Sequence, residues 1–259
     1  MDTERTAAHF DLTDKIIVVT GGSRGLGLAM CRAFAEAGAT VVVSSRKQEG
    51  CDAAAAEIAE ATGQTVVGIA CHVGDWDACD ALVDAVYERF GRIDVLVNNA
   101  GMSPLYDSLS SVSRELWDKV IAVNLAGPFR LSAVVGERMA AGAGGSIVNV
   151  SSIAAVAPTS MEVPYGTAKA GLNNLTQSIG RSFGPSVRCN CIMPGPFLTD
   201  ISHAWTDEVK ELLTSQIPMG RAGEADEIVG AALFLASDAS SFTNGAVIRI
   251  DGGMTYGTG

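Results

Sequence analysis

The stretch IIVVTGGSRGLGLAMCRAFAEAG, residues 16–38, predicts a buried strand, a glycine-rich turn and a helix in direct succession. Gly21 permits a tight turn out of the strand, and Gly25 and Gly27 let backbone approach a pyrophosphate and let the helix pack on the sheet. The start of such a helix offers unpaired amides and a positive dipole end to phosphates. No Lys-Ser or Lys-Thr pair follows the last glycine, so this is not a nucleoside triphosphatase loop. We interpret the stretch as a dinucleotide-binding turn, with a glycine turn that binds nothing as the alternative.

Apolar runs of strand length recur along the chain, and Ala-rich amphipathic stretches of helical length lie between them. The runs cover residues 16–20, 40–45, 66–71, 93–100, 145–152, 187–195 and 246–253, and the helical stretches cover 26–37, 50–62, 75–90, 113–141, 165–183 and 224–236. The runs are nearly continuous in apolar content, as expected for strands covered on both faces. This alternation predicts an α/β fold of the Rossmann type, with a doubly wound parallel sheet and helices on both faces.

No linker, repeat or low-complexity segment divides the chain. We therefore expect a single domain over residues 1–259. Its cofactor half should cover about 14–150, and its catalytic and substrate half about 151–259. Residues 196–216, PFLTDISHAWTDEVKELLTSQ, are predicted to form a lid over the cofactor.

Composition and charge narrow the classes of function. The chain has 259 residues, of which 47% are hydrophobic and 18% charged, so it is globular in composition. Its net charge of -11 argues against binding to nucleic acid or an anionic membrane, because both need basic patches. The N-terminal MDTERTAAHFDLTDK lacks the apolar core of a signal peptide, and no apolar run approaches the roughly 20 residues of a membrane helix. We expect a soluble, cytoplasmic protein.

The cysteines and histidines do not form a recognisable metal site. They are Cys31, Cys51, Cys71, Cys79, Cys189, Cys191, His9, His72 and His203. None of the cysteines belongs to a CxxC pair and the histidines are scattered, so we favour buried free thiols over a zinc site. No metal is predicted.

The end of the second strand indicates which dinucleotide is bound. A site for NAD(H) usually has an acidic residue there, about 20 positions after the glycine turn, to hold the ribose 2′-hydroxyl. The chain instead reads VVVSSRK, with Ser44 and Ser45 at the acidic position and Arg46 next, and Arg24 lies inside the glycine turn. Two guanidinium groups and no carboxylate suit a 2′-phosphate, so NADP(H) is favoured over NAD(H). The alternative is that both arginines are solvated surface charges.

Tyr165 and Lys169 are the candidate proton-transfer pair. In VPYGTAKAG, residues 163–171, they stand four positions apart at the start of a predicted helix, so they project from one face. A tyrosine with its ordinary pKa near 10 is too weak an acid for chemistry at neutral pH. A nearby ammonium and an oxidised nicotinamide would lower that pKa. In isolation the pair is common by chance, but Ser152 lies at the end of the strand that precedes it, at the sheet edge where α/β proteins bind ligands.

At this point the sequence resembles the classical short-chain dehydrogenase/reductase family, over nearly the whole chain. The resemblance rests on TGGSRGLG at 20–27, NNAG at 98–101, Asn124, Ser152, YGTAK at 165–169, PG at 194–195 and DGG at 251–253. It implies that Tyr165 is the general acid in reduction and the base in oxidation, and that Ser152 polarises the carbonyl. It implies that Lys169 holds the nicotinamide ribose and tunes the tyrosine, and that Asn124 fixes a water in a proton relay.

The resemblance also implies the fold and the cofactor contacts. The sheet should have seven parallel strands, and the protein should be a homotetramer or a homodimer. Asn98, Ala100 and Gly101 should line the adenosine and ribose side. The residues expected to bind the cofactor are Gly21, Ser23, Arg24, Gly25, Leu26, Gly27, Ser45, Arg46, His72, Val73, Asn98, Ala100, Gly101, Tyr165, Lys169, Pro194, Gly195 and Thr199.

Two features depart from the common family pattern. The turn FGPSV at 183–187 is about one residue shorter than the resemblance leads us to expect. The third strand usually ends in Asp-Val, but here it ends in His72-Val73, which puts the adenine contact in doubt. VVVSSRKQE at 41–49, CHVG at 71–74 and SSIAA at 151–155 are similar to NADPH-dependent carbonyl/retinal reductases found in peroxisomes. The chain ends in MTYGTG and carries no Ser-Lys-Leu-type peroxisomal address.

We expect an NADP(H)-dependent oxidoreductase that moves a hydride between nicotinamide and a small ketone or secondary alcohol. A reductase of 3-oxoacyl groups on acyl carrier protein or coenzyme A is the enzyme alternative. The segment ERMAAGAGGS at 137–146 is nearly bare of the bases that an acidic carrier would need. A non-catalytic dinucleotide sensor on the same fold is the third reading.

Overall fold

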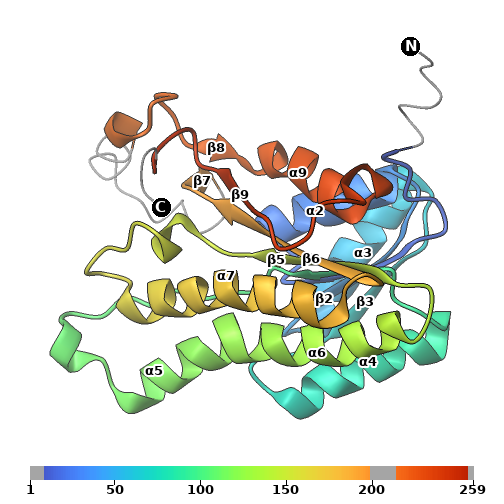
Figure 1. Cartoon of the computed structure of the whole chain (residues 1–259), viewed down its shortest axis with the longest axis horizontal. Coiled ribbons are helices and arrows are strands. Elements are labelled where there is room, and N and C mark those ends of the chain that lie inside the picture. Colours follow the sequence, from blue (N-terminus) through green and yellow to red (C-terminus); the bar gives the residue numbers. More distant parts are fainter. Residues whose placement is uncertain (1–8, 199–213, 256–259) are drawn as a thin grey trace.

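The computed structural model describes residues 9–198 and 214–255. Seven parallel strands form its main sheet, in the order β3-β2-β1-β4-β5-β6-β9. Figure 1 shows this sheet between two layers of helices. They are β1 (Ile16–Thr20), β2 (Thr40–Ser45), β3 (Val66–Ala70), β4 (Val95–Asn98), β5 (Gly145–Val150), β6 (Val187–Pro194) and β9 (Val247–Ile250). The predicted α/β fold with a seven-stranded, doubly wound parallel sheet in one domain is confirmed.

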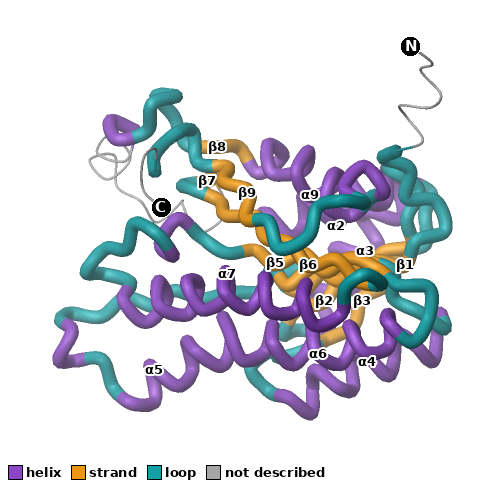
Figure 2. The backbone as a smooth tube through the Cα atoms, viewed as in Figure 1, coloured by secondary structure: helices purple, strands orange, loops and turns teal. Residues whose placement is uncertain are grey.

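Helices cover both faces of this sheet (Figure 2). They are α2 (Gly25–Glu36), α3 (Gln48–Thr62), α4 (Trp76–Phe90), α5 (Arg114–Ile121), α6 (Gly127–Ala140), α7 (Val163–Phe183) and α9 (Val229–Ala236). Asp75 caps α4 by accepting hydrogen bonds from the amides of Asp77 and Ala78, as an acid at a helix start should. Gly63 and Gly91 end α3 and α4 in the left-handed conformation.

The core consists of two apolar layers, one on each side of the sheet. Val19 packs with Phe34 in the layer under α2, α3 and α9. Its neighbour Val18 packs with Leu131 in the layer under α4, α6 and α7. Because successive strand residues point to opposite faces, a strand in the middle of two layers must be apolar at every position. This explains the unbroken IIVVT run.

The strand order reverses next to β1, which positions the site. From β1 the chain runs outward through β2 and β3, then returns to the other side of β1 with β4. At this switch the loops after β1 and β4 part, and open α/β sheets bind ligands in the crevice that results. The carboxyl ends of β1 and β4 are Thr20 and Asn98.

The long helix expected over 113–141 is interrupted. Five residues, Ala122–Ala126, form a π-helical turn between α5 and α6, and the Gly127 amide donates to the carbonyl of Ala122. By length and composition, Arg114–Ala140 could cross a membrane, but half of its most apolar window is buried inside the fold. A buried core helix passes the same test, so this run is weak evidence for a membrane span.

The predicted lid at 196–216 lies mostly outside the described residues. Its first part includes β7 (Phe197–Leu198), which pairs in parallel with β8 (Gly223–Glu224) in a separate two-stranded sheet. The Gly223 amide donates to the carbonyl of Pro196 at 3.0 Å. The two flanks of the segment are therefore joined to each other.

Candidate active site

The glycine turn is built so that three segments approach closely. Gly21 has a positive φ of 66°, and a Cβ there would lie 2.8 Å from Asn99 Nδ2. At Gly27 an added Cβ would lie 2.2 Å from the Gly21 carbonyl oxygen. Only glycine fits at either position without a shift of backbone, as predicted from the sequence. Ser23 lies on the side of the turn that faces Gly50 of α3.

Helix α2 begins at Gly25 with its amide end uncovered by a side chain. Arg24 holds the N-cap position without a side-chain hydrogen bond, and no acidic residue lies in the first turn, which contains Leu26. The positive end of the helix dipole is therefore available to an anion.

Thr20 and Asn99 hold the glycine turn to the next strand. The Thr20 hydroxyl accepts from the amides of Asn99 and Ala100, both at 3.1 Å. Asn99 Nδ2 donates to the carbonyls of Thr20 at 2.9 Å and Gly21 at 3.3 Å. Neither residue was predicted as a site residue from the sequence, although Thr20 precedes the first glycine and Asn99 is the second asparagine of NNAG.

The end of β2 carries no acid and lies against the glycine turn. The Gly22 amide donates to the carbonyl of Ser44 at 3.0 Å. Ser45 is half-buried and its hydroxyl contacts the Cys51 thiol at 3.2 Å. Arg24 and Arg46 are exposed, and neither forms an ion pair within the described ranges 9–198 and 214–255. Two free guanidinium groups thus lie in the segments that meet here.

Tyr165 and Ser152 come together at the carboxyl edge of the sheet. Tyr165 lies in the first turn of α7, and Ser152 follows β5 and accepts from the Ala154 amide at 3.2 Å. The Ser152 hydroxyl is also close enough to the Tyr165 phenol to lower the pKa of that phenol. This pairing is the geometry that acid–base chemistry on a carbonyl oxygen needs.

Lys169 lies one turn further along the same face of α7. It is only 2% exposed, and its Nζ donates to the carbonyl of Val150 at 2.7 Å. Nζ lies 5.6 Å from the centre of the Tyr165 ring. Burial lowers the pKa of Lys169 to about 8. An ammonium has three donors, and Val150 is its one hydrogen-bond acceptor in the described part of the chain.

The predicted lowering of the Tyr165 pKa is wrong for the protein groups alone. Desolvation raises the pKa of this phenol to about 12, against a smaller lowering by the Ser152 hydroxyl. The sequence shows that Lys169 is near but not how strongly the half-buried tyrosine is desolvated. Desolvation disfavours the phenolate more than the protein's neighbouring groups favour it.

Asn124 is positioned by the π-helical turn. Its side chain is fully buried, and Nδ2 donates to the carbonyls of Met102 and Val120, both at 2.9 Å. Its Oδ1 accepts from the Met102 amide at 3.2 Å. A Cβ on Gly101 would lie 2.9 Å from Asn124 Oδ1 and 3.6 Å from Lys169 Nζ, so these three residues converge. π-Helical turns are often found at functional sites for this reason.

Asn98 is not brought to the surface of the crevice. It is 1% exposed, and its Nδ2 donates to Ser132 Oγ at 3.0 Å and to Asn149 Oδ1 at 2.9 Å. Asn149 Nδ2 in turn donates to Thr176 Oγ1 at 2.9 Å. The Asn98 side chain therefore joins β4 to β5 and α6 beneath the sheet, while Asn99 faces the glycine turn.

The remaining predicted residues lie at the same edge. His72 is exposed and Val73 is buried where β3 ends, and a Cβ on Gly127 would lie 2.0 Å from the Val73 carbonyl oxygen. Pro194 ends β6, and the Gly195 amide donates to the carbonyl of Ile250 at 2.9 Å. Thr199 lies outside the described residues.

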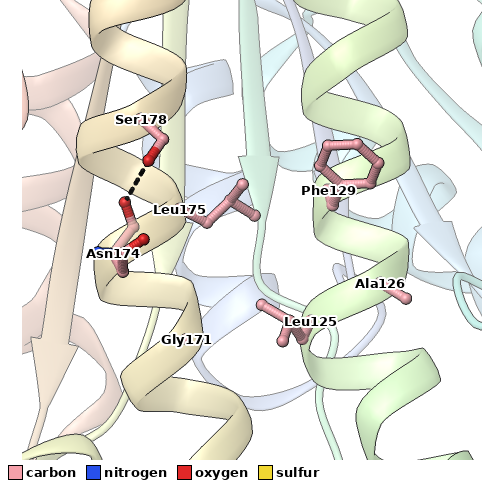
Figure 3. A pocket seen from close by; sticks show the side chains of 7 residues that line it. All are labelled: Leu125, Ala126, Phe129, Gly171, Asn174, Leu175 and Ser178. Carbon is pink, nitrogen blue, oxygen red and sulfur yellow. Dashed lines mark hydrogen bonds between the residues drawn. The ribbon is translucent and has the colours of Figure 1, made fainter.

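A groove on the outer side of α6 and α7 contains none of these residues. Its lining consists of Leu125, Ala126, Phe129, Gly171, Asn174, Leu175 and Ser178 (Figure 3). The groove lies between the two helices, and its walls are mainly apolar. It is a surface feature distinct from the crevice that holds Tyr165.

All six cysteines are free and buried. Burial raises the pKa of the Cys31, Cys189 and Cys191 thiols, which keeps them protonated. Within the described residues no three His, Cys, Asp or Glu side chains gather as a metal site would require.

Comparison with known proteins places this site in a family. A family model described as "Enoyl-(Acyl carrier protein) reductase" matches residues 21–255. L-rhamnose 1-dehydrogenase (NAD(P)(+)) of Azotobacter vinelandii is 40% identical over 250 residues, which cover 94% of this chain and 97% of that protein. D-threitol dehydrogenase of Mycolicibacterium smegmatis is 40% identical over 248 residues, 95% of each chain.

A solved structure has the same fold over almost the whole length. The gluconate 5-dehydrogenase from Burkholderia cenocepacia, in complex with NADP and tartrate, superposes with a TM-score of 0.92 at 32% identity. The match covers 96% of this chain and 98% of that one. With the strand order, the glycine turn and the Ser-Tyr-Lys arrangement, these matches show that the chain belongs to the short-chain dehydrogenase/reductase family of oxidoreductases, which act on alcohols and ketones.

Proposed function

We propose that this protein is an NADP(H)-dependent oxidoreductase that interconverts a small ketone and a secondary alcohol, with Tyr165 as general acid and base. The observation that carries the proposal is the position of the Tyr165 phenol beside the Ser152 hydroxyl, with the buried ammonium of Lys169 5.6 Å from the centre of the Tyr165 ring. A purely structural tyrosine has no need of these two neighbours at a ligand-binding edge of the sheet.

The described residues fit a dinucleotide. Gly21 and Gly27 let the turn pack closely against Asn99 without a side chain in the way, and the uncovered start of α2 suits the pyrophosphate. Arg24, Ser45 and Arg46 would hold the 2′-phosphate, and the two spare donors of Lys169 would take the ribose hydroxyls. His72 and Val73 would border the adenine, and Ala100, Gly101, Pro194 and Gly195 the ribose and nicotinamide side. When bound, the nicotinamide supplies or accepts the hydride.

The chain itself handles the proton and the charge. In reduction the Tyr165 phenol donates its proton to the substrate oxygen, and in oxidation the phenolate accepts it. The Ser152 hydroxyl donates to the same oxygen and stabilises its negative charge. The Asn124 side chain fixes Met102 and the loop after β4, which keeps the wall of the crevice beside Lys169 in place.

Arg46→Asp should weaken NADPH selectively. It removes a charge-assisted partner of the 2′-phosphate and adds repulsion, so we expect kcat/KM for NADPH to fall by about 10- to 100-fold and that for NADH to change little. Steady-state kinetics with both cofactors measures this. Arg181→Asp, which makes the same charge change at the far end of α7, is the control. An unchanged NADPH/NADH preference would show that Arg46 is a surface charge.

We propose a narrower class of substrate than the alcohols and ketones of the family as a whole. The 40% identical relatives are named for a sugar and a polyol, which favours a neutral hydroxyl or carbonyl compound. A 3-oxoacyl reductase on acyl carrier protein or coenzyme A is the second candidate. A net charge of -11 disfavours an acidic carrier by slowing association. A non-catalytic sensor would have no use for the complete Ser152-Tyr165-Lys169 set.

We also propose a homo-oligomer, as a tetramer or a dimer, located in the cytoplasm. The mainly apolar groove between α6 and α7 offers a surface for a second copy (Figure 3).

A further inference from the structure

A carboxylate lies beside the proposed catalytic tyrosine. Glu162 immediately precedes α7, and with Tyr165 it lines a crevice between the start of α7, α5 and the loop after β4. The other residues of this lining are Ser103, Pro104, Tyr106, Leu116, Val120 and Pro164. The charge of Glu162 acts on the phenol: after burial, it is the other group that raises the pKa of Tyr165. A negatively charged substrate at the same phenol would be repelled by the same carboxylate.

Nothing described neutralises this charge. The lining contains no lysine or arginine, and Glu162 forms no ion pair with any residue in 9–198 or 214–255. Among the described residues, its carboxylate accepts one hydrogen bond, from the Thr159 hydroxyl at 3.2 Å. Lys169, the other charged group near the tyrosine, is directed to the Val150 carbonyl. An approaching substrate therefore meets a partly exposed carboxylate.

The position of Glu162 is fixed by Tyr106. The Tyr106 hydroxyl donates to the carbonyl of Ser160 and accepts from the Val163 amide, both at 2.8 Å. These two bonds hold both ends of the segment 160–163 that contains Glu162. The backbone that carries Glu162 is therefore fixed next to Tyr165, and the Thr159 hydroxyl is the group that holds the carboxylate.

We propose, resting on the function proposed above, that Glu162 makes this site selective for uncharged ketones and hydroxyl compounds and against substrates that carry a carboxylate or phosphate near the reacting carbon. Repulsion between two like charges near the protein surface corresponds to about three- to tenfold in kcat/KM. L-Rhamnose and D-threitol are neutral, whereas gluconate is an anion, so the proposal separates this chain from its gluconate-oxidising structural neighbour.

The test compares pairs of related substrates in which one member carries a carboxylate and the other is uncharged. NADPH-dependent reduction of ethyl acetoacetate and acetoacetate gives one ratio of kcat/KM, and NADP+-dependent oxidation of D-threitol and D-threonate gives another. In Glu162→Gln we expect the preference for the neutral member to fall by about three- to tenfold, and in Glu162→Lys to fall further. Each ratio is taken within one variant, so an altered Tyr165 pKa or a partly unfolded fraction cancels.

Glu60→Gln is the matched control. It removes one negative charge from the exposed face of α3, and both ratios should stay at the wild-type value. Ratios that stay unchanged in both Glu162 variants overturn the inference and leave the proposed function intact. If wild type turns over no member of either pair, the proposed function fails for this substrate class. In that case calorimetry measures the affinity of the NADPH-bound protein for each member of the same pairs. The ratio of the two affinities within each pair then tests the role of Glu162 in the same way.

Discussion

Tyr165→Phe should reduce turnover by about 10²- to 10⁴-fold while NADPH affinity stays within about twofold of wild type. The change removes the phenol oxygen that exchanges the proton with the substrate, and leaves the ring in its place. Ser152 loses the neighbouring phenol oxygen but keeps its hydrogen bond from the Ala154 amide. Steady-state kinetics and a fluorescence titration with NADPH separate the two effects.

The two directions of the reaction should respond differently to pH. Burial raises the Tyr165 pKa to about 12, so the phenol that reduction needs is present throughout the neutral range. Oxidation needs the phenolate, whose fraction rises about tenfold per pH unit below the pKa. We expect kcat for oxidation to climb from pH 7 to 10 and kcat for reduction to stay level until the alkaline range.

Tyr87→Phe is the control for Tyr165→Phe. It removes a phenol oxygen from α4, a helix that carries none of the proposed catalytic residues. It should leave kcat unchanged. Wild-type turnover in Tyr165→Phe would remove the tyrosine from the mechanism. A large loss of NADPH affinity in that variant would instead assign it to cofactor binding.

Gly27→Ala adds a single methyl group and should strongly reduce the affinity for NADPH. The new Cβ would lie 2.2 Å from the Gly21 carbonyl oxygen and 2.6 Å from Asn99 Nδ2. Neither atom can yield easily, because Asn99 Nδ2 is bonded to the carbonyls of Thr20 and Gly21. The start of α2 must therefore move away from the turn. We expect NADPH affinity to fall by about 100-fold and the free energy of unfolding to fall by about 1–3 kcal/mol.

Gly230→Ala is the matched control for this substitution. Gly230 lies in α9, and a Cβ there meets nothing within 4 Å. The same methyl group should raise the free energy of unfolding by about 0.5–1 kcal/mol, because alanine favours a helix interior. Urea unfolding and NADPH titration measure both variants. Wild-type NADPH affinity in Gly27→Ala would show that the close approach in the turn is not needed by the cofactor.

The strands were predictable because each is buried on both faces. An unbroken run such as IIVVT leaves no alternative that hides every side chain, and the observed β1 has the predicted bounds. The π-helical turn was not predictable, because one extra residue in a turn hardly disturbs the apolar repeat of a long helix. That turn nevertheless determines where Asn124 points.

The roles of two neighbouring residues at the end of β4 could not be predicted from the sequence. Residues 98 and 99 are both asparagine, but successive strand residues point to opposite sides. Only the packing of α6 beneath β4 decides that Asn98 is buried and Asn99 faces the turn. The direction of the Tyr165 pKa failed for a related reason, since spacing reports which groups are near and not how far water is excluded.

The most direct test of the account is NADPH oxidation by the purified protein against a small carbonyl panel, with NADH in parallel. The panel holds an aromatic α-diketone, retinal, ethyl acetoacetate and acetoacetyl-CoA, and D-threitol with NADP+ covers the reverse direction. We predict turnover of at least one uncharged member, with kcat/KM for NADPH exceeding that for NADH. Turnover of acetoacetyl-CoA alone would move the protein to the acyl-thioester reductases. Tight NADPH binding without any turnover would contradict the catalytic assignment.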